Sequence, residues 1–213
     1  MLSMQKTCAA LFCIPMAVMA QAGIVGWTGD VQVISPPPSV REGEKTSNDW
    51  AFLFSERTGA VLAADLWVDA YQAGFYDAPG DLAGKYIPAG TTVNSYLLHM
   101  DQTALFGSSF SGSFTFEVGE QIAGVIVTRN PLDISDSLGA PGVEYPLPGA
   151  DREFDLNQIT GGDDFTIQGS LRTISFNASL WAGLDHMRII TVPEPASLAL
   201  LIVGVAFGVA RRR

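Results

Sequence analysis

Two histidines, His99 and His186, are the side chains of this 213-residue chain best suited to acid–base chemistry near neutral pH. A Ser-His-Asp hydrolase would pair one of them with a serine in a sharp turn. Ser109, Ser111 and Ser113 stand in a Ser/Gly-rich stretch that predicts a turn, but no Gly-x-Ser-x-Gly sequence occurs. Both histidines also fall within stretches that predict β-strands. The pattern favours a protein without a catalytic site and makes a hydrolase the weakest of three hypotheses.

Residues that could bind a metal ion are sparse. The only cysteines, Cys8 and Cys13, lie near the N-terminus, and two scattered histidines do not make a zinc site. Calcium takes oxygen ligands from Asp-rich loops. The candidate donors are Asp133, Asp136, Asp163 and Asp164. Because aspartate is also an ordinary turn residue and no EF-hand pattern occurs, we assign no metal site and no cofactor.

Tryptophans offer a second kind of binding site. Sugars pack on exposed aromatic rings, which combine a large apolar face with a polar edge. Trp27, Trp50 and Trp181 lie near the ends of predicted strands or in loops. Tryptophan is more often buried than exposed, so these residues support a carbohydrate-binding module, with or without calcium, as the alternative hypothesis.

The charge of the chain restricts its partners. The whole sequence has 12 basic and 22 acidic residues, for a net charge of −10. Without Lys6, Glu194 and the three arginines at the C-terminus, 8 basic and 21 acidic residues remain, so the middle carries 8 − 21 = −13. Nucleic-acid binding needs clustered Lys and Arg, so nucleic acid is excluded as a partner.

The middle of the chain reads as short β-like stretches separated by Gly, Pro, Asn and Asp. The predicted strands are Val31–Ile34, Ala51–Ser55, Val61–Trp67, Thr92–Met100, Ser113–Val118, Ile122–Thr128, Asp164–Gln168, Leu171–Ala178 and His186–Thr191. Several alternate with a period of two, as half-buried strands do. A helix over Ala60–Ala73 is the less favoured interpretation, and Asn130–Ala150 predicts a long loop. We therefore expect an all-β domain over residues 23–191, an antiparallel β-sandwich that could be of the jelly-roll type.

The N-terminal segment has the form of a secretory signal peptide. Lys6 supplies a positive charge, Cys8–Ala20 is an apolar stretch, and Ala20 and Ala22 form a small-x-small site. We expect residues 1–22 to direct export through the Sec machinery, with cleavage after Ala22 or, as second choice, after Ala20. Both cysteines leave with this segment, so the mature chain has no disulfide.

The C-terminal segment combines a second apolar stretch with a basic end. Residues 196–210 contain Ser197 as their one polar side chain, and Arg211, Arg212 and Arg213 follow. About 15 helical residues span roughly 22 Å, which is short for a bilayer core of about 30 Å, but the arginines can reach the headgroups. Because positive flanks stay in the cytoplasm, we expect a transmembrane helix with the domain outside.

The residues before this helix carry a resemblance to a known family. Val192-Pro193-Glu194-Pro195, the short apolar helix and the terminal arginines stand in the order of the PEP-CTERM sorting signal of exported bacterial proteins, which residues 192–213 resemble. The resemblance implies that an integral-membrane, transpeptidase-like enzyme, an exosortase, recognises Pro193, Glu194 and Pro195 and cleaves near them. It also implies that Arg211, Arg212 and Arg213 act as the membrane stop.

Location and role follow as expectations. The C-terminal helix would hold the protein in the inner membrane until processing transfers it to the cell surface or the extracellular space. Proteins of this family are associated with exopolysaccharide and biofilm material. The resemblance therefore implies a non-enzymatic, structural or adhesive role, with the carbohydrate-binding module as the alternative.

Overall fold

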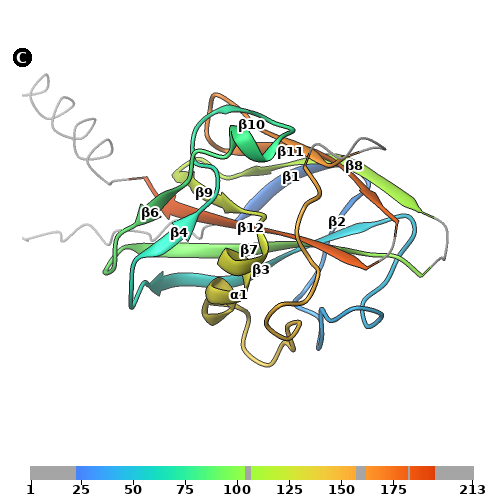
Figure 1. Ribbon diagram of the computed structural model, residues 1–213. Helices are drawn as coiled ribbons and strands as arrows, with labels where there is room; N and C mark the ends of the chain where they lie inside the picture. Colours follow the sequence, from blue (N-terminus) through green and yellow to red (C-terminus); the bar gives the residue numbers. More distant parts are fainter. Residues whose placement is uncertain (1–22, 104–106, 157–161, 182, 195–213) are drawn as a thin grey trace, which may run out of the picture.

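The protein folds as two five-stranded β-sheets that pack face to face (Figure 1). The computed structural model describes residues 23–103, 107–156, 162–181 and 183–194. Sheet A contains, in spatial order, β1 (Ile24–Gly29), β8 (Ser108–Phe116), β11 (Thr173–Leu180), β10 (Asp164–Ile167) and β5 (Gly74–Tyr76). Sheet B contains β2 (Val31–Val33), β3 (Ala51–Val61), β7 (Thr92–Asp101), β12 (Leu184–Pro193) and β9 (Glu120–Ile126).

Smaller elements cover sheet B. They are the two-stranded sheet of β4 (Leu66–Val68) and β6 (Lys85–Ile87), the helix α1 (Arg129–Ser135) and the 3-10 turn η2 (Asp136–Leu138). A second 3-10 turn, η1 (Pro79–Asp81), contacts β5 of sheet A instead. The cover lies close, because a Cβ at Gly124 on β9 would come within 2.4 Å of Val68 on β4. Only glycine fits at that contact.

Sheet A has one buried and one exposed face. Along β8, the rings of Phe110, Phe114 and Phe116 point into the core, while Ser111, Ser113 and Thr115 point outward. β11 repeats the pattern with Ile174 and Phe176. Each fully buried side chain of this size contributes about 1.5–3 kcal/mol by leaving water, so the alternation fixes which face is buried.

Sheet B is buried on both faces, and its central strands do not alternate. In β7, every residue after Thr92 is buried. Leu98 and Met187 face the core shared with sheet A, whereas Ile190 contacts the cluster under α1 and β4. On this second face the polar side chains of Ser95, His99, His186 and Arg188 are buried and must bind partners there, whereas Asn94 and Thr191 lie on the face toward sheet A.

The all-β prediction is confirmed. All pairings between the strands described are antiparallel except the parallel pair of β2 and β3, so sheet B is mixed. The jelly-roll form stays a prediction. The strand predicted over Val61–Trp67 is wrong: β3 runs on to Val61, the chain turns where Asp65 accepts the N–H of Ala89 at 2.8 Å, and β4 begins at Leu66.

The predicted long loop Asn130–Ala150 is not all loop, because it includes most of α1, which begins at Arg129, and all of η2. Pro131 lies in the first turn of α1, where a missing N–H costs nothing. The three-residue strands β5 and β6 and the edge strand β1 were also missed, because such short stretches carry almost no periodicity.

Candidate functional site

The sorting motif begins inside the folded domain. β12 continues to Pro193, so Val192 and Pro193 pair with Gln121 and Glu120 of β9. The N–H of Glu194 donates to the carbonyl oxygen of Gly119 at 2.6 Å. We call residues 119–121 and 191–194 the sorting junction. In Figure 1 the arrow of β12 ends at the left edge of the sandwich.

A buried carboxylate fixes the start of the sorting junction. Glu120 is 1% exposed, and its Oε1 accepts hydrogen bonds from Asn94 Nδ2 at 2.9 Å, from the Tyr96 hydroxyl at 2.8 Å and from the Thr191 hydroxyl. Burial, together with the negative charge of Glu120, raises the pKa of Tyr96. Oε2 of Glu120 has no partner among the described residues. Thr191 is therefore bound through both its backbone pairing and its side chain.

A groove of about 490 Å³ lies beside the sorting junction. Its walls come from the segment before β5, from β6, from β9, from the turn before β11 and from Val192. Lys85 Nζ lies 4.2 Å above the centre of the Tyr71 ring on one wall. Gln121 borders the groove and reaches Glu194 Oε1 with its Nε2 at 3.4 Å. The side chain of Val192 therefore borders a space that solvent can enter.

The other predicted sorting residues lie outside the described residues. These are Ala20, Ala22, Pro195, Arg211, Arg212 and Arg213, together with the predicted signal peptide and the apolar helix. Among the helices that the structure describes, none is long and apolar enough to cross a membrane.

The outer face of sheet A is covered mainly by short serine and threonine side chains, together with Asp164 and Asn177. Its members are Thr28, Ser109, Ser111, Ser113, Thr115, Asp164, Thr166, Thr173, Ser175, Asn177 and Ser179, which we call the hydroxyl face. One row crosses all five strands, from Thr28 through Ser113, Ser175 and Thr166 to Phe75. Neighbouring strands are linked by pairs such as Thr28 Oγ1 to Ser113 Oγ at 2.8 Å.

The predicted turn at Ser109, Ser111 and Ser113 is wrong, because all three serines belong to β8. For Ser113 this agrees with the strand predicted over Ser113–Val118. The three serines lie on the outer face of sheet A, whereas His99 and His186 form a buried cross-strand pair on the covered face of sheet B. The structure does not bring the serines and the histidines together.

The two histidines bind each other. His99 Nε2 donates to the carbonyl oxygen of Lys45 at 2.8 Å, so its Nδ1 is the acceptor for His186 Nε2 at 2.7 Å. Burial lowers the pKa of His99 to about 4 and the pKa of His186 well below its usual value, where the neighbouring His99 adds to the effect. The pair is therefore neutral at pH 7 and buried on the covered face of sheet B.

A buried ion network is the largest polar feature that the sequence did not predict. Arg188 of β12 binds both carboxylate oxygens of Glu56, with Nε at 2.8 Å and Nη2 at 2.9 Å. Asp136 bridges Arg188 at 3.0 Å and Arg152 at 2.8 Å, and Arg152 also binds Asp133 at 2.7 Å. Burial alone lowers the pKa of Arg188, but the charge and hydrogen bonds of Glu56, together with the charge of Asp136, outweigh it and raise that pKa above its usual value. The side chains of both arginines are fully buried.

The four aspartates named as candidate calcium donors already bind other groups of the protein. Asp133 and Asp136 bind arginines, so they are already neutralised. Asp163 accepts the N–H groups of Asp155 at 2.7 Å and Ser179 at 2.8 Å, and Asp164 accepts Asn177 Nδ2 at 2.9 Å. In the described part of the chain, no group of three or more His, Cys, Asp or Glu side chains is arranged to hold a metal ion.

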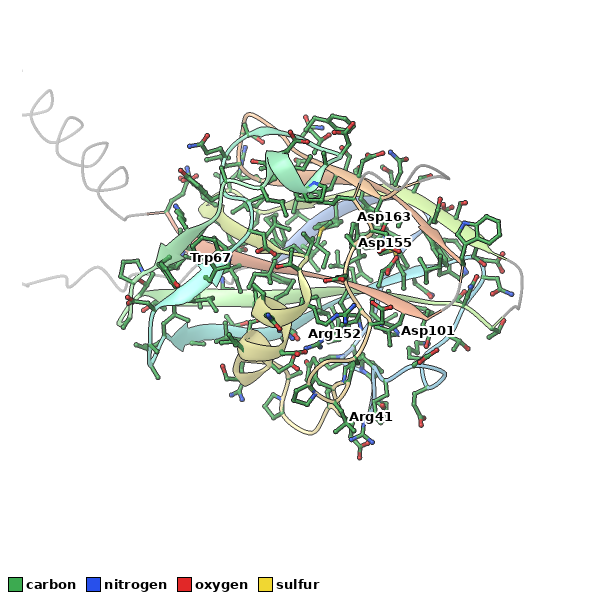
Figure 2. The ribbon with its side chains drawn as sticks, in the orientation of Figure 1. Arg41, Trp67, Asp101, Arg152, Asp155 and Asp163 are labelled. Atoms are coloured by element: carbon green, nitrogen blue, oxygen red, sulfur yellow. The ribbon has the colours of Figure 1, made fainter. Side chains whose placement is uncertain are left out.

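Three carboxylates gather near the start of β12. Asp155 and Asp163 lie close together in Figure 2, and Asp185 follows them at the beginning of the strand. Burial raises the pKa of Asp163 to about 6. Burial, and then the charges of Asp163 and Asp155, raise the pKa of Asp185 well above its usual value. Asp185 therefore holds its proton in the folded protein where it would ionise in the unfolded chain.

This cluster makes a pH-dependent prediction for Asp185→Asn. Between about pH 4 and its raised pKa, folded Asp185 binds more protons than unfolded Asp185, so wild-type stability falls as the pH rises. Asparagine removes that loss, because it cannot ionise. We expect the variant to gain in Tm relative to wild type from pH 4 to pH 7.5, by more than about 3 °C. Calorimetry at both pH values checks this, and a Tm difference independent of pH contradicts it.

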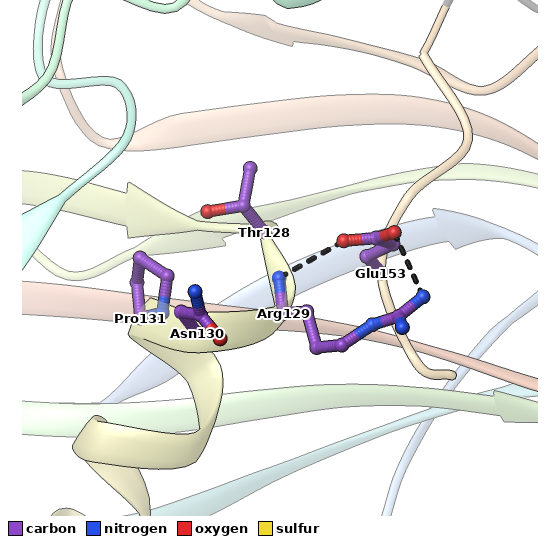
Figure 3. A pocket seen from close by; sticks show the side chains of 5 residues that line it. All are labelled: Thr128, Arg129, Asn130, Pro131 and Glu153. Atoms are coloured by element: carbon purple, nitrogen blue, oxygen red, sulfur yellow. Dashed lines mark hydrogen bonds and ion pairs between the residues drawn. The ribbon is translucent and has the colours of Figure 1, made fainter. Parts of the chain in front are cut away.

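An open hollow at the first turn of α1 has a structural explanation. It is lined by Thr128, Arg129, Asn130, Pro131 and Glu153 (Figure 3). Glu153 accepts the backbone N–H of Arg129 at 3.1 Å and its Nη2 at 3.0 Å. A carboxylate at a helix start binds N–H groups that have no partner within the helix, so Glu153 serves as the cap.

The three tryptophans of the carbohydrate hypothesis are exposed. Trp27, on the edge strand β1, is 51% exposed, Trp50 is 44% exposed and Trp181 is 70% exposed. Trp50 precedes β3 and Trp181 follows β11, so they lie away from the sorting junction at the other end of the strands. The expectation that such residues are usually buried does not hold here.

Comparison with known proteins identifies the C-terminal segment. Residues 191–213 match the family model described as the PEP-CTERM protein-sorting motif. No curated protein and no solved structure matches the chain. The match begins at Thr191, so its first residues are those of the sorting junction. The chain is therefore a PEP-CTERM domain-containing protein, exported and processed at the membrane as a substrate of exosortase.

Proposed function

We propose that this exported protein is a non-enzymatic component of the cell surface or the extracellular matrix, and that it adheres there to neutral exopolysaccharide. The observation that carries the proposal is the hydroxyl face of sheet A, with its row of side chains from Thr28 to Phe75. Export and processing by exosortase are consistent with that location.

The chemistry of the hydroxyl face suits a polymer of sugars. Serine and threonine hydroxyls donate and accept hydrogen bonds, as sugar hydroxyls do. Short side chains already bound to one another, such as Thr115 and Thr173 at 3.0 Å, lose little conformational freedom when they bind a ligand. Phe75, 56% exposed, stands on the edge strand β5 at the end of the row and offers an apolar ring to sugar faces. Trp27 pairs with Phe114, so its ring lies on the other side of sheet A.

The charge of the protein selects among polysaccharides. The segment between the two terminal signals carries a net charge of −13, which repels an acidic polymer. Among the members of the hydroxyl face Asp164 is the one ionisable residue, and it binds Asn177, while the carboxylate of Asp30 binds Ser111 at the edge of the face. A neutral glycan therefore approaches this face without charge repulsion. The calcium-assisted form of the carbohydrate hypothesis has no supporting contact among the described residues.

Ser175→Glu tests the proposal, because Ser175 stands at the centre of the row. A long, charged side chain there separates a sugar chain from the hydroxyls on either side. We expect retention on neutral polysaccharides such as dextran or cellulose to fall by about tenfold or more, equivalent to about 1.4 kcal/mol. Affinity electrophoresis of the soluble domain measures the loss.

The matched control is Ser137→Glu, the same change at an exposed serine of η2, away from sheet A. It should bind like wild type. Wild-type protein that binds no neutral polysaccharide, or a Ser175→Glu variant that binds as well as wild type, contradicts the adhesive role.

A further inference from the structure

The sorting motif lacks a linker that would separate it from the folded domain. β12 lies between β7 and β9 as far as Thr191, which pairs with Asn94 of β7. Beyond Thr191 the strand pairs with β9 alone, through Val192 and Pro193, and then through the N–H of Glu194. Pro193 and Glu194, the first two residues of Pro-Glu-Pro, are therefore paired on one side only. They extend a strand that lies inside the sheet up to Thr191.

A transpeptidase-like cleft binds an extended peptide through its free backbone groups. The groups of Val192–Glu194 that face β9 are occupied in the fold, since the N–H of Glu194 lies 2.6 Å from the oxygen of Gly119. A segment cannot pair with β9 and lie in an enzyme cleft by the same edge. We propose that exosortase engages Pro193 and Glu194 only after residues 192–194 separate from β9, so that sheet B gates its own processing.

The extent of the opening follows from the anchor at Thr191. Its hydroxyl binds buried Glu120, and its backbone lies between two strands, so separation stops there. Val192, in contrast, borders the solvent-accessible groove and pairs on one side. Three freed residues add about 10 Å of extended chain between the domain and Pro195. That length moves the sandwich away from the membrane surface while the enzyme acts.

A disulfide between Gln121→Cys and Val192→Cys tests the gate in cells that contain exosortase. Directly paired residues of an antiparallel ladder lie within disulfide reach, and the chain has no other cysteine after Cys13. Because the oxidised bond prevents separation, we expect processing of the full-length protein to slow by at least tenfold. A reductant should restore the wild-type rate. Pulse-chase labelling, with the processed and unprocessed forms resolved on a gel, measures both rates.

Two further variants separate gating from misfolding. Ser109→Cys with Ser179→Cys places a disulfide in sheet A, where the two hydroxyl oxygens lie 3.5 Å apart, and should not slow processing. Six Gly/Ser residues inserted between Val192 and Pro193 of the locked variant free the whole motif and should restore processing without reductant. Wild-type speed in the locked variant, or failure of the insertion to restore it, overturns the proposal.

The inference rests on processing by exosortase and is independent of the polysaccharide proposal. Wild-type protein in the same cells is the reference, and it must lose its C-terminal segment. If wild type and the linker variant both remained uncut, the sorting assignment itself would fall, and the gate with it. Loss of polysaccharide binding alone leaves the processing rates unchanged.

Discussion

Arg188→Met is expected to lower the free energy of unfolding by about 3–5 kcal/mol, the largest stability effect of the changes considered. The substitution keeps the volume but leaves Glu56 buried and without its cation, and it removes one of the two arginines on Asp136. Uncompensated buried charge costs several kcal/mol, since the carboxylate loses both water and its ion pair. Urea unfolding of residues 23–194, followed by tryptophan fluorescence, measures the change.

Arg129→Met is the matched control. Arg129 also binds two carboxylates, Asp151 at 2.6 Å and Glu153 at 3.0 Å, but its side chain is 37% exposed. Because water screens that pair, the same substitution should cost about 1 kcal/mol or less. Equal losses for the two variants would mean that burial of the Arg188 network adds nothing. A double-mutant cycle of Arg188→Met with Glu56→Gln should reveal a coupling of roughly 1–3 kcal/mol.

Replacement of Pro193, Glu194 and Pro195 by alanine should leave full-length protein in the membrane, with processing reduced by at least about a hundredfold. The family match covers these three positions, and a loss of about 2.7 kcal/mol in recognition corresponds to that factor. The two prolines also disfavour helical backbone at Val192 and Glu194, so alanines remove that restriction on the segment that the enzyme must bind in extended form. Membrane fractionation and immunoblotting against the domain measure the accumulated precursor.

The control for this change is Glu117→Ala with Val118→Ala, in the turn before β9 and near the same end of the sandwich. Val118 is 78% exposed, so the pair alters the neighbouring surface without changing the motif. Normal processing of the control and of the alanine variant alike would show that the enzyme does not recognise Pro-Glu-Pro in this chain.

The fold was predictable where one face of a strand meets water. The Ser/Phe alternation at the end of β8 gave the strand and its buried face correctly. In β7 and β12 both faces are buried, so the sequence gives strong apolar stretches but no register. The helix α1 was missed because seven residues make fewer than two turns of periodicity, and its Pro131 resembles a loop residue.

The sorting motif was predictable because its information is local: three neighbouring residues, an apolar stretch and a basic end. Its attachment to β9 was not, because a pairing of Pro193 with Glu120 joins residues 73 positions apart. The hydroxyl face was hidden for the same reason, since the row of Ser113 and Ser175 exists only after distant strands align. The burial of Arg188 and Arg152 could not be predicted, because an isolated arginine in a sequence usually lies on the protein surface.

The position of β12 has a consequence for the order of folding during export. It is the last strand of the described chain, yet it lies inside sheet B, between β7 and β9. A polypeptide that emerges from its N-terminus cannot finish that sheet until Pro193 has crossed, so long-range pairing waits for the final residues. Before then β7 and β9 have open edges, which are hazards for aggregation. The domain therefore completes its fold at the same moment as the sorting segment reaches the bilayer.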